Sequence, residues 1–340
     1  MMRFRSRRLF EPEREAARAA APSPMLARYG RDLFRTYGIV IAFVILVGIV
    51  AWGNPAFLSS ANVFNMLSQW APAGIMAVGM TYVILTGGFD LSIASGYSLC
   101  AVTAAALGQH VDPALAYLAA IAVGTVLGLV NGLLVAGANI NPFITTVGTG
   151  FVMAGVTLVL TENAAFVVSD EAFATLGAGR WHGFPFSGMM LIGFLVIGGV
   201  ALARTVYGQA VYAVGGNPEA SRLSGIRVRT VVGSTYVLSG ACVGIAGVIT
   251  ASQLNSAQAS IDPAIVFDVL TIVVVGGTSL GGGFGSMWRT AVGIGIIATI
   301  ANGFVLLNIN PFYQDIIKGS IIVGALALDV FARRLAARAR

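Results

Sequence analysis

Few residues in this chain could do chemistry, and those that could lie singly among apolar neighbours. Asp90 follows two glycines between two apolar runs, and Asp268 lies inside the apolar residues 265–275. An ionised side chain at the centre of a membrane helix costs roughly 2.5–3.5 kcal/mol on insertion scales, so it must pair or line a polar path. These isolated carboxylates are therefore either transport groups or buried polar anchors of the fold.

Each carboxylate admits a functional and a structural interpretation. Asp90 sits at a break between two spans, where it would either line a pathway through a broken helix or cap the next helix. Asp268 has no charged neighbour in the sequence, and we expect it to face other helices or water rather than lipid. Asp315 and Lys318 are three residues apart, so we expect them to pair on one helical face.

The other reactive side chains are too scattered for a metal site, a disulfide framework or a catalytic centre. Four of them stand isolated in the sequence: His110, His182, Cys100 and Cys242. The two cysteines lie in apolar runs, where a thiol behaves as a small buried apolar group. We therefore predict that the chain is not an enzyme and holds no cofactor or metal of its own.

Nucleotide hydrolysis by a phosphate-binding loop is excluded by the lysine content. Such a loop needs a lysine followed by Ser or Thr after a glycine-rich turn. Lys318 is the only lysine of the chain, and Gly319 follows it. The glycine-rich residues 276–285 have the density of a phosphate cradle, but without that lysine a tight turn between closely packed helices is the better interpretation.

The composition identifies the class of protein. The chain is 57% hydrophobic and 10% charged over 340 residues, against roughly 25% charged for a soluble domain. Its 43 glycines favour close approach of helix backbones within a membrane. These values predict an all-α, polytopic transmembrane helical bundle.

The apolar runs divide into ten candidate spans of about 20 residues or slightly fewer. They cover residues 37–53, 66–86, 91–108, 114–136, 142–161, 187–204, 231–252, 264–280, 289–307 and 312–330. An eight-span arrangement with one short run re-entrant is the main alternative. The sequence NINPF occurs at 139–143 and again at 308–312, but the spacing of the flanking runs does not support an internal repeat.

The basic residues predict the orientation. Of 20 Lys and Arg residues, nine lie within 3–35, four within 204–229 and four within 333–340. Loops rich in Lys and Arg stay in the cytoplasm, and ten spans place all three segments on one side. We therefore predict an Arg-rich, partly disordered cytoplasmic arm at 1–35, a transmembrane domain at 36–330 and a basic tail at 331–340.

The longest polar interruption in the second half of the chain, at residues 205–230, has the pattern of a short capped helix. Two glycines at 215–216 end the preceding segment, and Asn217 with Pro218 predicts an N-cap and a first helical turn. Glu219 in that turn suits the helix dipole, and Gly225 predicts the C-terminal stop. The helix is either a contact for a partner outside the membrane or an ordinary amphipathic loop helix.

Four motifs together resemble the permeases of ribose-type ABC importers. They are AVGMTYVILTGGFDLS at 77–92, YAVGGN at 212–217 with RLSGI at 222–226, VGGTSL at 275–280, and YQ at 313–314 with Lys318. The resemblance runs from about residue 37 to 330 and leaves out the Arg-rich arm. It departs from the family at Ala154, where many relatives have Arg, and at Phe89, where relatives often have Ile.

The resemblance implies a dimeric pore in the bacterial inner membrane, with both termini in the cytoplasm. Two ATPase subunits carrying ATP and Mg, a periplasmic sugar-binding protein, a second permease copy and membrane lipid would be its partners, and nucleic acid would not. It also implies that the capped helix is the coupling helix that seats in the ATPase. The implied coupling residues are Gly215, Gly216, Asn217, Pro218, Glu219, Ala220, Ser221, Arg222, Leu223, Ser224, Gly225 and Ile226.

A neutral sugar needs hydroxyl and amide partners rather than ion pairs, which fits the sparse charge of the spans. The residues predicted to line the path are Asn65, Gln69, Thr81, Phe89, Asp90, Ser92, Asp268 and Asn302. Another small solute, namely a nucleoside, an autoinducer or a branched-chain amino acid, is the alternative substrate. An ion-coupled secondary transporter is the alternative mechanism, and it would need carboxylates grouped at mid-membrane.

Overall fold

The computed structural model describes residues 24–259, 264–310, 312–320, 323–324 and 327. The chain divides into two compact units, residues 1–45 and 46–340, and the second unit holds the features described below. The helix α2 (Pro24–Gly53) begins well before the first predicted span. Residues 24–35, which the sequence places in a partly disordered arm, are therefore helical.

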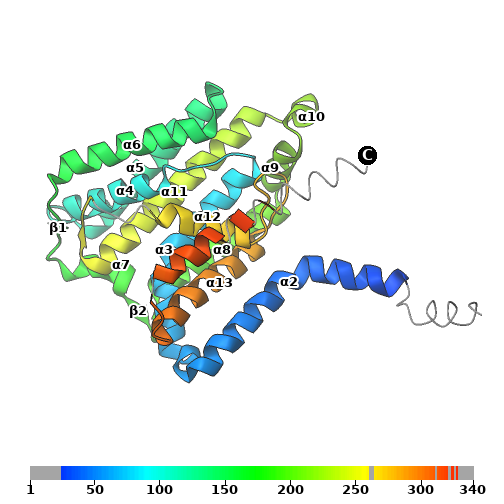
Figure 1. Ribbon diagram of the computed structural model, residues 1–340. Helices are drawn as coiled ribbons and strands as arrows, with labels where there is room; N and C mark the ends of the chain where they lie inside the picture. Colours follow the sequence, from blue (N-terminus) through cyan, green and yellow to red (C-terminus); the bar gives the residue numbers. More distant parts are fainter. Residues whose placement is uncertain (1–23, 260–263, 311, 321–322, 325–326, 328–340) are drawn as a thin grey trace, which may run out of the picture. The chain divides into compact units, whose positions relative to one another are not determined.

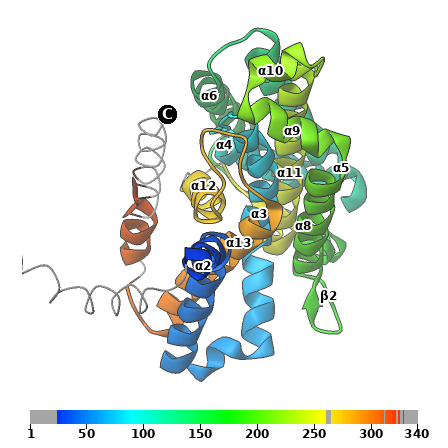
Figure 2. The same cartoon turned by 90° about the vertical axis from the view of Figure 1, so that its right-hand side faces the viewer.

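The second unit is almost entirely helical (Figures 1 and 2). Its longer helices are α3 (Ser60–Leu85), α4 (Ile93–Gly108), α5 (Pro113–Gly132), α6 (Pro142–Thr161), α8 (Phe186–Arg204), α9 (Val206–Gly216), α11 (Val228–Leu254), α12 (Ile265–Val275) and α13 (Met287–Leu306). The short elements are η1 (Pro55–Leu58), the π-turn η2 (Leu133–Gly137), η3 (Glu171–Ala174), α7 (Thr175–Ala178), α10 (Pro218–Leu223), β1 (Phe166–Val167), β2 (Arg180–Trp181), β3 (Phe184–Pro185) and β4 (Ser256–Ala257). Residues 312–320 are also helical.

Each predicted span overlaps a helix among the described residues, so the polytopic helical class is confirmed. Among the described residues, five helices are long and apolar enough to cross a membrane: Pro113–Gly137, Pro142–Thr161, Phe186–Arg204, Val228–Leu254 and Met287–Leu306. The stretch predicted as a span at 264–280 is shorter in the structure, because α12 has 11 residues. Such a helix rises about 16 Å, roughly half the thickness of a bilayer core.

α11 lies at the centre of this unit, packed against α3, α4 and α5 (Figure 1). Its contact with α5 is a backbone contact made by facing glycines. A Cβ on Gly124 would lie 2.5 Å from the carbonyl oxygen of Gly240 and 2.8 Å from Cα of Gly244. The glycine content therefore supports close helix packing here, as the composition predicts.

The largest apolar cluster joins α3 to α11, α12 and α13. Its members include Met76, Met80, Ile249, Ile272 and Ile297, all nearly or fully buried. By contrast α6 exposes large apolar side chains such as Phe151 and Val159. Exposed apolar side chains of this kind on a membrane helix face lipid or a partner chain.

The two ends of this unit differ in construction. One end, called the β end, carries the antiparallel pair β1–β4 and the hairpin β2–β3. Gln109 Nε2 donates to the carbonyl oxygen of Val167 at 3.0 Å, and Asn54 Nδ2 donates to that of Leu306 at 3.1 Å. The opposite end, called the α10 end, carries α9 and α10 (Figures 1 and 2). The structure thus places the loops at the β end opposite the basic segment at residues 205–230.

Candidate functional site: an exposed capped helix and a buried polar break

Local hydrogen bonds start α10 as the sequence predicts. Asn217 is its N-cap, and the side-chain oxygen accepts from the backbone N–H of Ala220 at 2.9 Å. Pro218 occupies the first helical position. A backbone N–H at that position has no partner within the helix, so proline, which lacks one, costs no hydrogen bond there. α9 ends at Gly216, directly before the cap, so the two glycines separate two helices.

Gly225 ends α10 in the left-handed conformation, with a φ of 84°. The N–H of Gly225 donates to the carbonyl of Arg222 at 3.1 Å, and that of Ile226 donates to the carbonyl of Ser221 at 3.0 Å. This pair of bonds is the Schellman arrangement, which satisfies carbonyls that the helix leaves free. The predicted stop is confirmed, and both ends of the helix are fixed by its own sequence.

The charged pair of α10 is local and solvent-exposed. Arg222 lies 2.6 Å from a carboxylate oxygen of Glu219, one turn away. The hydrogen bond and the charge of Arg222 lower the pKa of Glu219, and the same pair raises the pKa of Arg222. An exposed pair of this kind contributes little to stability.

α10 presents most of its surface to the outside. Ser221 is its one buried residue, whereas Leu223 is 76% exposed. A capped helix with an exposed leucine beside an exposed ion pair can bind a macromolecular partner without reorganising. This surface is therefore the best candidate contact site at the α10 end.

The second candidate feature is the break between α3 and α4, residues 86–92. Asp90 is 2% exposed. One of its oxygens accepts from the Ser92 hydroxyl at 2.6 Å and from the Ser92 N–H at 3.2 Å, and the other accepts from Ser239 on α11 at 3.0 Å. Ser92 itself is the N-cap of α4 and makes no capping bond of its own. The carboxylate therefore holds the turn that leads into α4, instead of capping that helix directly.

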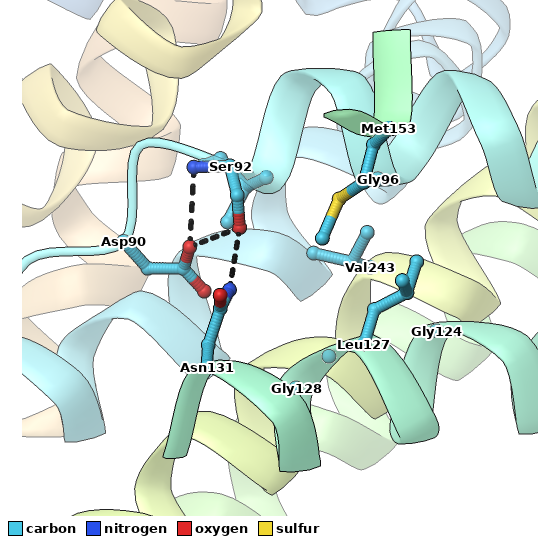
Figure 3. A pocket seen from close by; sticks show the side chains of 11 residues that line it. Asp90, Ser92, Gly96, Gly124, Leu127, Gly128, Asn131, Met153 and Val243 are labelled. Carbon is cyan, nitrogen blue, oxygen red and sulfur yellow. Dashed lines mark hydrogen bonds between the residues drawn. The ribbon is translucent and has the colours of Figure 1, made fainter. Parts of the chain in front are cut away.

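The network around Asp90 extends to α5, α6 and α11, and Figure 3 shows the part that joins Asp90 and Ser92 to Asn131. Asn131 on α5 donates to the Ser92 hydroxyl at 2.8 Å and accepts from Thr149 on α6 at 2.8 Å. Tyr236 on α11 donates to the carbonyl of Phe89 at 3.0 Å. A cavity of about 10 Å³ adjoins Asp90, which is room for about one water molecule. A sugar does not fit there in this conformation.

The structure separates the predicted path residues into buried and accessible sets. Thr81 is fully buried and lies 2.9 Å from the hydroxyl of Thr290. Thr81, Asp90 and Ser92 form the buried set, and all three contact other protein groups. The accessible or half-buried set consists of Asn65, Gln69, Phe89, Asp268 and Asn302. The predicted residues are thus not brought together into a single site.

Two members of the accessible set have partners near the β end. Asn65 accepts from the Arg180 guanidinium at 2.8 Å. Asn302 and Asn62 exchange hydrogen bonds between their amides at 2.9 and 3.0 Å. Amide groups at helix surfaces are suited to exchanging such bonds with hydroxyls of a neutral solute.

Asp268 forms an ion pair that the sequence does not predict. Lys318 lies 2.6 Å from a carboxylate oxygen of Asp268, and the two side chains are 14% and 19% exposed. The predicted pair of Lys318 with Asp315 is therefore wrong, because the lysine reaches across to α12. Asp315 is nearer to Lys318 in the sequence, but Asp268 is less exposed. An ion pair offsets the cost of removing a carboxylate from water, so Asp268 gains more from the lysine.

Sequence reasoning missed the residues that hold the break from other helices, namely Asn131, Thr146, Thr149, Tyr236 and Ser239. The sequence contains one signal of this network: Asn131 is an amide residue in an otherwise apolar run. Serine, threonine and tyrosine are too common in membrane helices to stand out.

A second hollow lies at the β end. Its volume is about 330 Å³, and it is lined by Ala101, Ala165, Thr250, Leu254, Ser256, Ala257 and Gln258. Small-molecule pockets have volumes of about 300–1,000 Å³. This hollow is therefore large enough for a molecule of monosaccharide size, whereas the cavity beside Asp90 is not.

Comparisons with known proteins agree with the resemblance seen in the sequence. Residues 62–326 match the family described as "Branched-chain amino acid transport system / permease component". The ribose import permease RbsC of Bacillus subtilis is 40% identical over 86% of this chain and 92% of its own length. The galactose/methyl galactoside import permease MglC of Escherichia coli is 33% identical over 89% and 98% of the two chains. The L-arabinose transport system permease AraH of Escherichia coli is 33% identical over 90% and 93%.

No solved structure matches the chain. The family match and these three relatives each cover most of the helical unit that contains α10 and the break at residues 86–92. The chain is a multi-pass membrane protein and belongs to this family of transport-system permeases.

Proposed function

We propose that this chain is the membrane subunit of an ATP-driven importer and that it translocates a monosaccharide. The observation that carries the proposal is α10, a capped and exposed helix at the end of the molecule where the basic loop lies. Such a helix gives a separate ATPase a rigid contact, and the family match supplies the transport context.

The orientation follows from charge. The α10 end carries Arg204, Arg222, Arg227 and Arg229, and the positive-inside rule assigns it to the cytoplasm. The β end carries exposed acidic residues such as Asp112, Asp170 and Glu171. We assign the β end to the periplasm, where a solute-binding protein would deliver the substrate, and both termini to the cytoplasm.

A neutral polyhydroxyl substrate is supported by the polar groups and by the relatives. The accessible predicted path residues include three amides, Asn65, Gln69 and Asn302. The ribose, galactose and arabinose permeases named above are relatives of this chain. Amide groups of this kind bind the hydroxyls of pentoses and hexoses alike, so the three sugars are the candidates to compare.

Ion-coupled transport is disfavoured by the state of the two carboxylates. Asp90 accepts hydrogen bonds on both oxygens, and Asp268 is paired with Lys318. A proton- or sodium-coupled carrier needs a carboxylate that exchanges its partner during each cycle. These contacts support a structural role for both groups.

The test is to purify the tagged chain from mild detergent and identify the co-purifying proteins. We expect a P-loop ATPase, and we expect uptake of labelled ribose, arabinose or galactose into proteoliposomes to need ATP and a binding protein. Recovery of this chain alone, with uptake driven by an ion gradient, would contradict the proposal. Competition among the three sugars then identifies the substrate.

A further inference from the structure

Three segments far apart in the sequence meet at the α10 end. They are the end of α3 at Leu85, the end of α9 at Gly215, and the glycine-rich turn after α12. Gly283 N–H donates to the carbonyl of Leu85 at 2.9 Å, and Tyr212 donates to the carbonyl of Gly285 at 2.8 Å. We call Leu85, Gly215, Gly282 and Gly283 the glycine junction.

The glycine junction has no room for side chains. A Cβ on Gly215 would overlap the carbonyl oxygen of Leu85 and would lie 2.5 Å from Gly283 N. Gly282 and Gly283 have φ values of 80° and 72°, and a Cβ on Gly282 would lie 2.9 Å from the carbonyl oxygen of Gly215. The contact is therefore backbone against backbone, with no rotamers to absorb a displacement.

Gly193 provides an internal comparison outside the coupling segment. It lies in α8, and a Cβ placed on it would meet nothing within 4 Å. Gly193 and Gly215 both lie in helices, so a change of either to Ala has a similar effect on helix propensity. Only the change at Gly215 disturbs the glycine junction.

The glycine junction also connects to the buried polar break. Leu85 is the last residue of α3, and residues 86–92 follow it directly. A Cβ on Gly88 would lie 2.6 Å from the hydroxyl of Tyr236, which donates to the carbonyl of Phe89. The contact thus joins the end of α9, through Leu85, to the turn that Asp90 holds.

We propose that Gly215, Gly282 and Gly283 are positioning residues that transmit the movement of α10 to the end of α3 and to the break at residues 86–92. The proposal rests on the function proposed above. It assigns a role to the glycine-rich turn, whose density is explained by the need for backbone contact with two other segments. The turn serves mechanical coupling, and its residues Gly276, Gly282 and Gly283 face protein backbone.

The test compares Gly215→Ala with Gly193→Ala in the complete complex, purified with its ATPase and reconstituted with the binding protein. Three quantities are measured: recovery of the ATPase, ATP hydrolysis, and solute imported per ATP hydrolysed. For Gly215→Ala we expect assembly and basal hydrolysis to persist while import per ATP falls by about tenfold, within the usual range of coupling between sites. Gly193→Ala should match the wild type.

Several outcomes would overturn this role. Normal import per ATP in Gly215→Ala would show that the contact transmits nothing, and an equal defect in Gly193→Ala would show that the contact is not the cause. If Gly215→Ala fails to assemble, Gly282→Ala decides, since its closest approach is milder and the same loss of import per ATP is expected. A wild-type complex without ATP-dependent import would instead refute the proposed function.

Discussion

α10 and the break at residues 86–92 are both short polar interruptions between helices, but they are held by opposite means. The bonds that define α10 join residues within one turn of each other, such as Asn217 to Ala220. The break is held from far away in the sequence. Ser239 bonds Asp90 across 149 positions, and Asn131 bonds Ser92 across 39.

This difference teaches what each region can do. A helix fixed by its own caps keeps its shape while its surroundings move, which suits a contact with a moving partner. A turn fixed by α5, α6 and α11 changes only when those helices shift relative to one another. In the proposed function, the first region would receive a displacement and the second would respond to one.

Replacing Asp90 with Leu should have the largest effect of the changes considered. It leaves the hydroxyls of Ser92 and Ser239 and the N–H of Ser92 without their acceptor. Unsatisfied buried groups cost about 1–3 kcal/mol each, so we expect a loss of at least about 3 kcal/mol in the free energy of unfolding. The measurement is thermal unfolding in detergent.

The matched control for that change is Ser239→Ala, which removes one donor to the same carboxylate. A single hydrogen bond to a charged group is worth about 1.5–3 kcal/mol, so its loss should be smaller than that of Asp90→Leu. Equal unfolding temperatures for Asp90→Leu and the wild type would mean that long-range bonds do not hold the break.

Replacing Lys318 with Met should rank second. The change removes the ion-pair partner of Asp268 but keeps an apolar side chain of similar length at position 318. Breaking a fully buried pair costs about 3–5 kcal/mol, and the partial exposure of this pair reduces the expected loss to about 2 kcal/mol. Comparing the thermal unfolding of Lys318→Met with that of Asp315→Asn tests which carboxylate pairs with the lysine. Only the first change should lower the unfolding temperature.

The contrast between the two regions also explains what the sequence could predict. The caps of α10 were predictable because Asn217, Pro218 and Gly225 act through bonds to near neighbours. The two NINPF copies have the same local explanation. Asn139 and Asn308 both adopt positive φ, and Asn141 and Asn310 both accept from the N–H two residues on.

The partners of Asp90 and Asp268 could not be predicted, because choosing them requires the arrangement of helices. One sequence fits many packings, and only the fold brings Ser239 to Asp90 and Lys318 to Asp268. The extent of α12 was also overestimated. The apolar run continues into glycines at 276–277, which belong to the turn that reaches Gly215.

Replacing Asn217 with Ala tests the local side of the comparison. Loss of an N-cap costs about 1 kcal/mol of helix stability, and the described bonds confine that cost to α10. We expect amide exchange at residues 221 and 224–226 to speed up by about fivefold, the equivalent of 1 kcal/mol, with the global unfolding temperature unchanged. A drop in that temperature similar to that of Ser239→Ala would remove the distinction between the two regions.

The smallest effect is expected for Glu219→Gln. The Glu219–Arg222 pair is exposed, so the unfolding temperature at neutral pH should not change measurably. Because Arg222 lowers the pKa of Glu219, the pair stabilises α10 above the carboxyl's ordinary pKa and stops doing so as the pH falls through the lowered value. Amide exchange in α10, taken relative to Glu219→Gln at each pH, should therefore show protection of the wild type at neutral pH that disappears in acid. A ratio that stays constant with pH would mean that the caps alone hold the helix, and the separation between local and long-range support would then be sharper still.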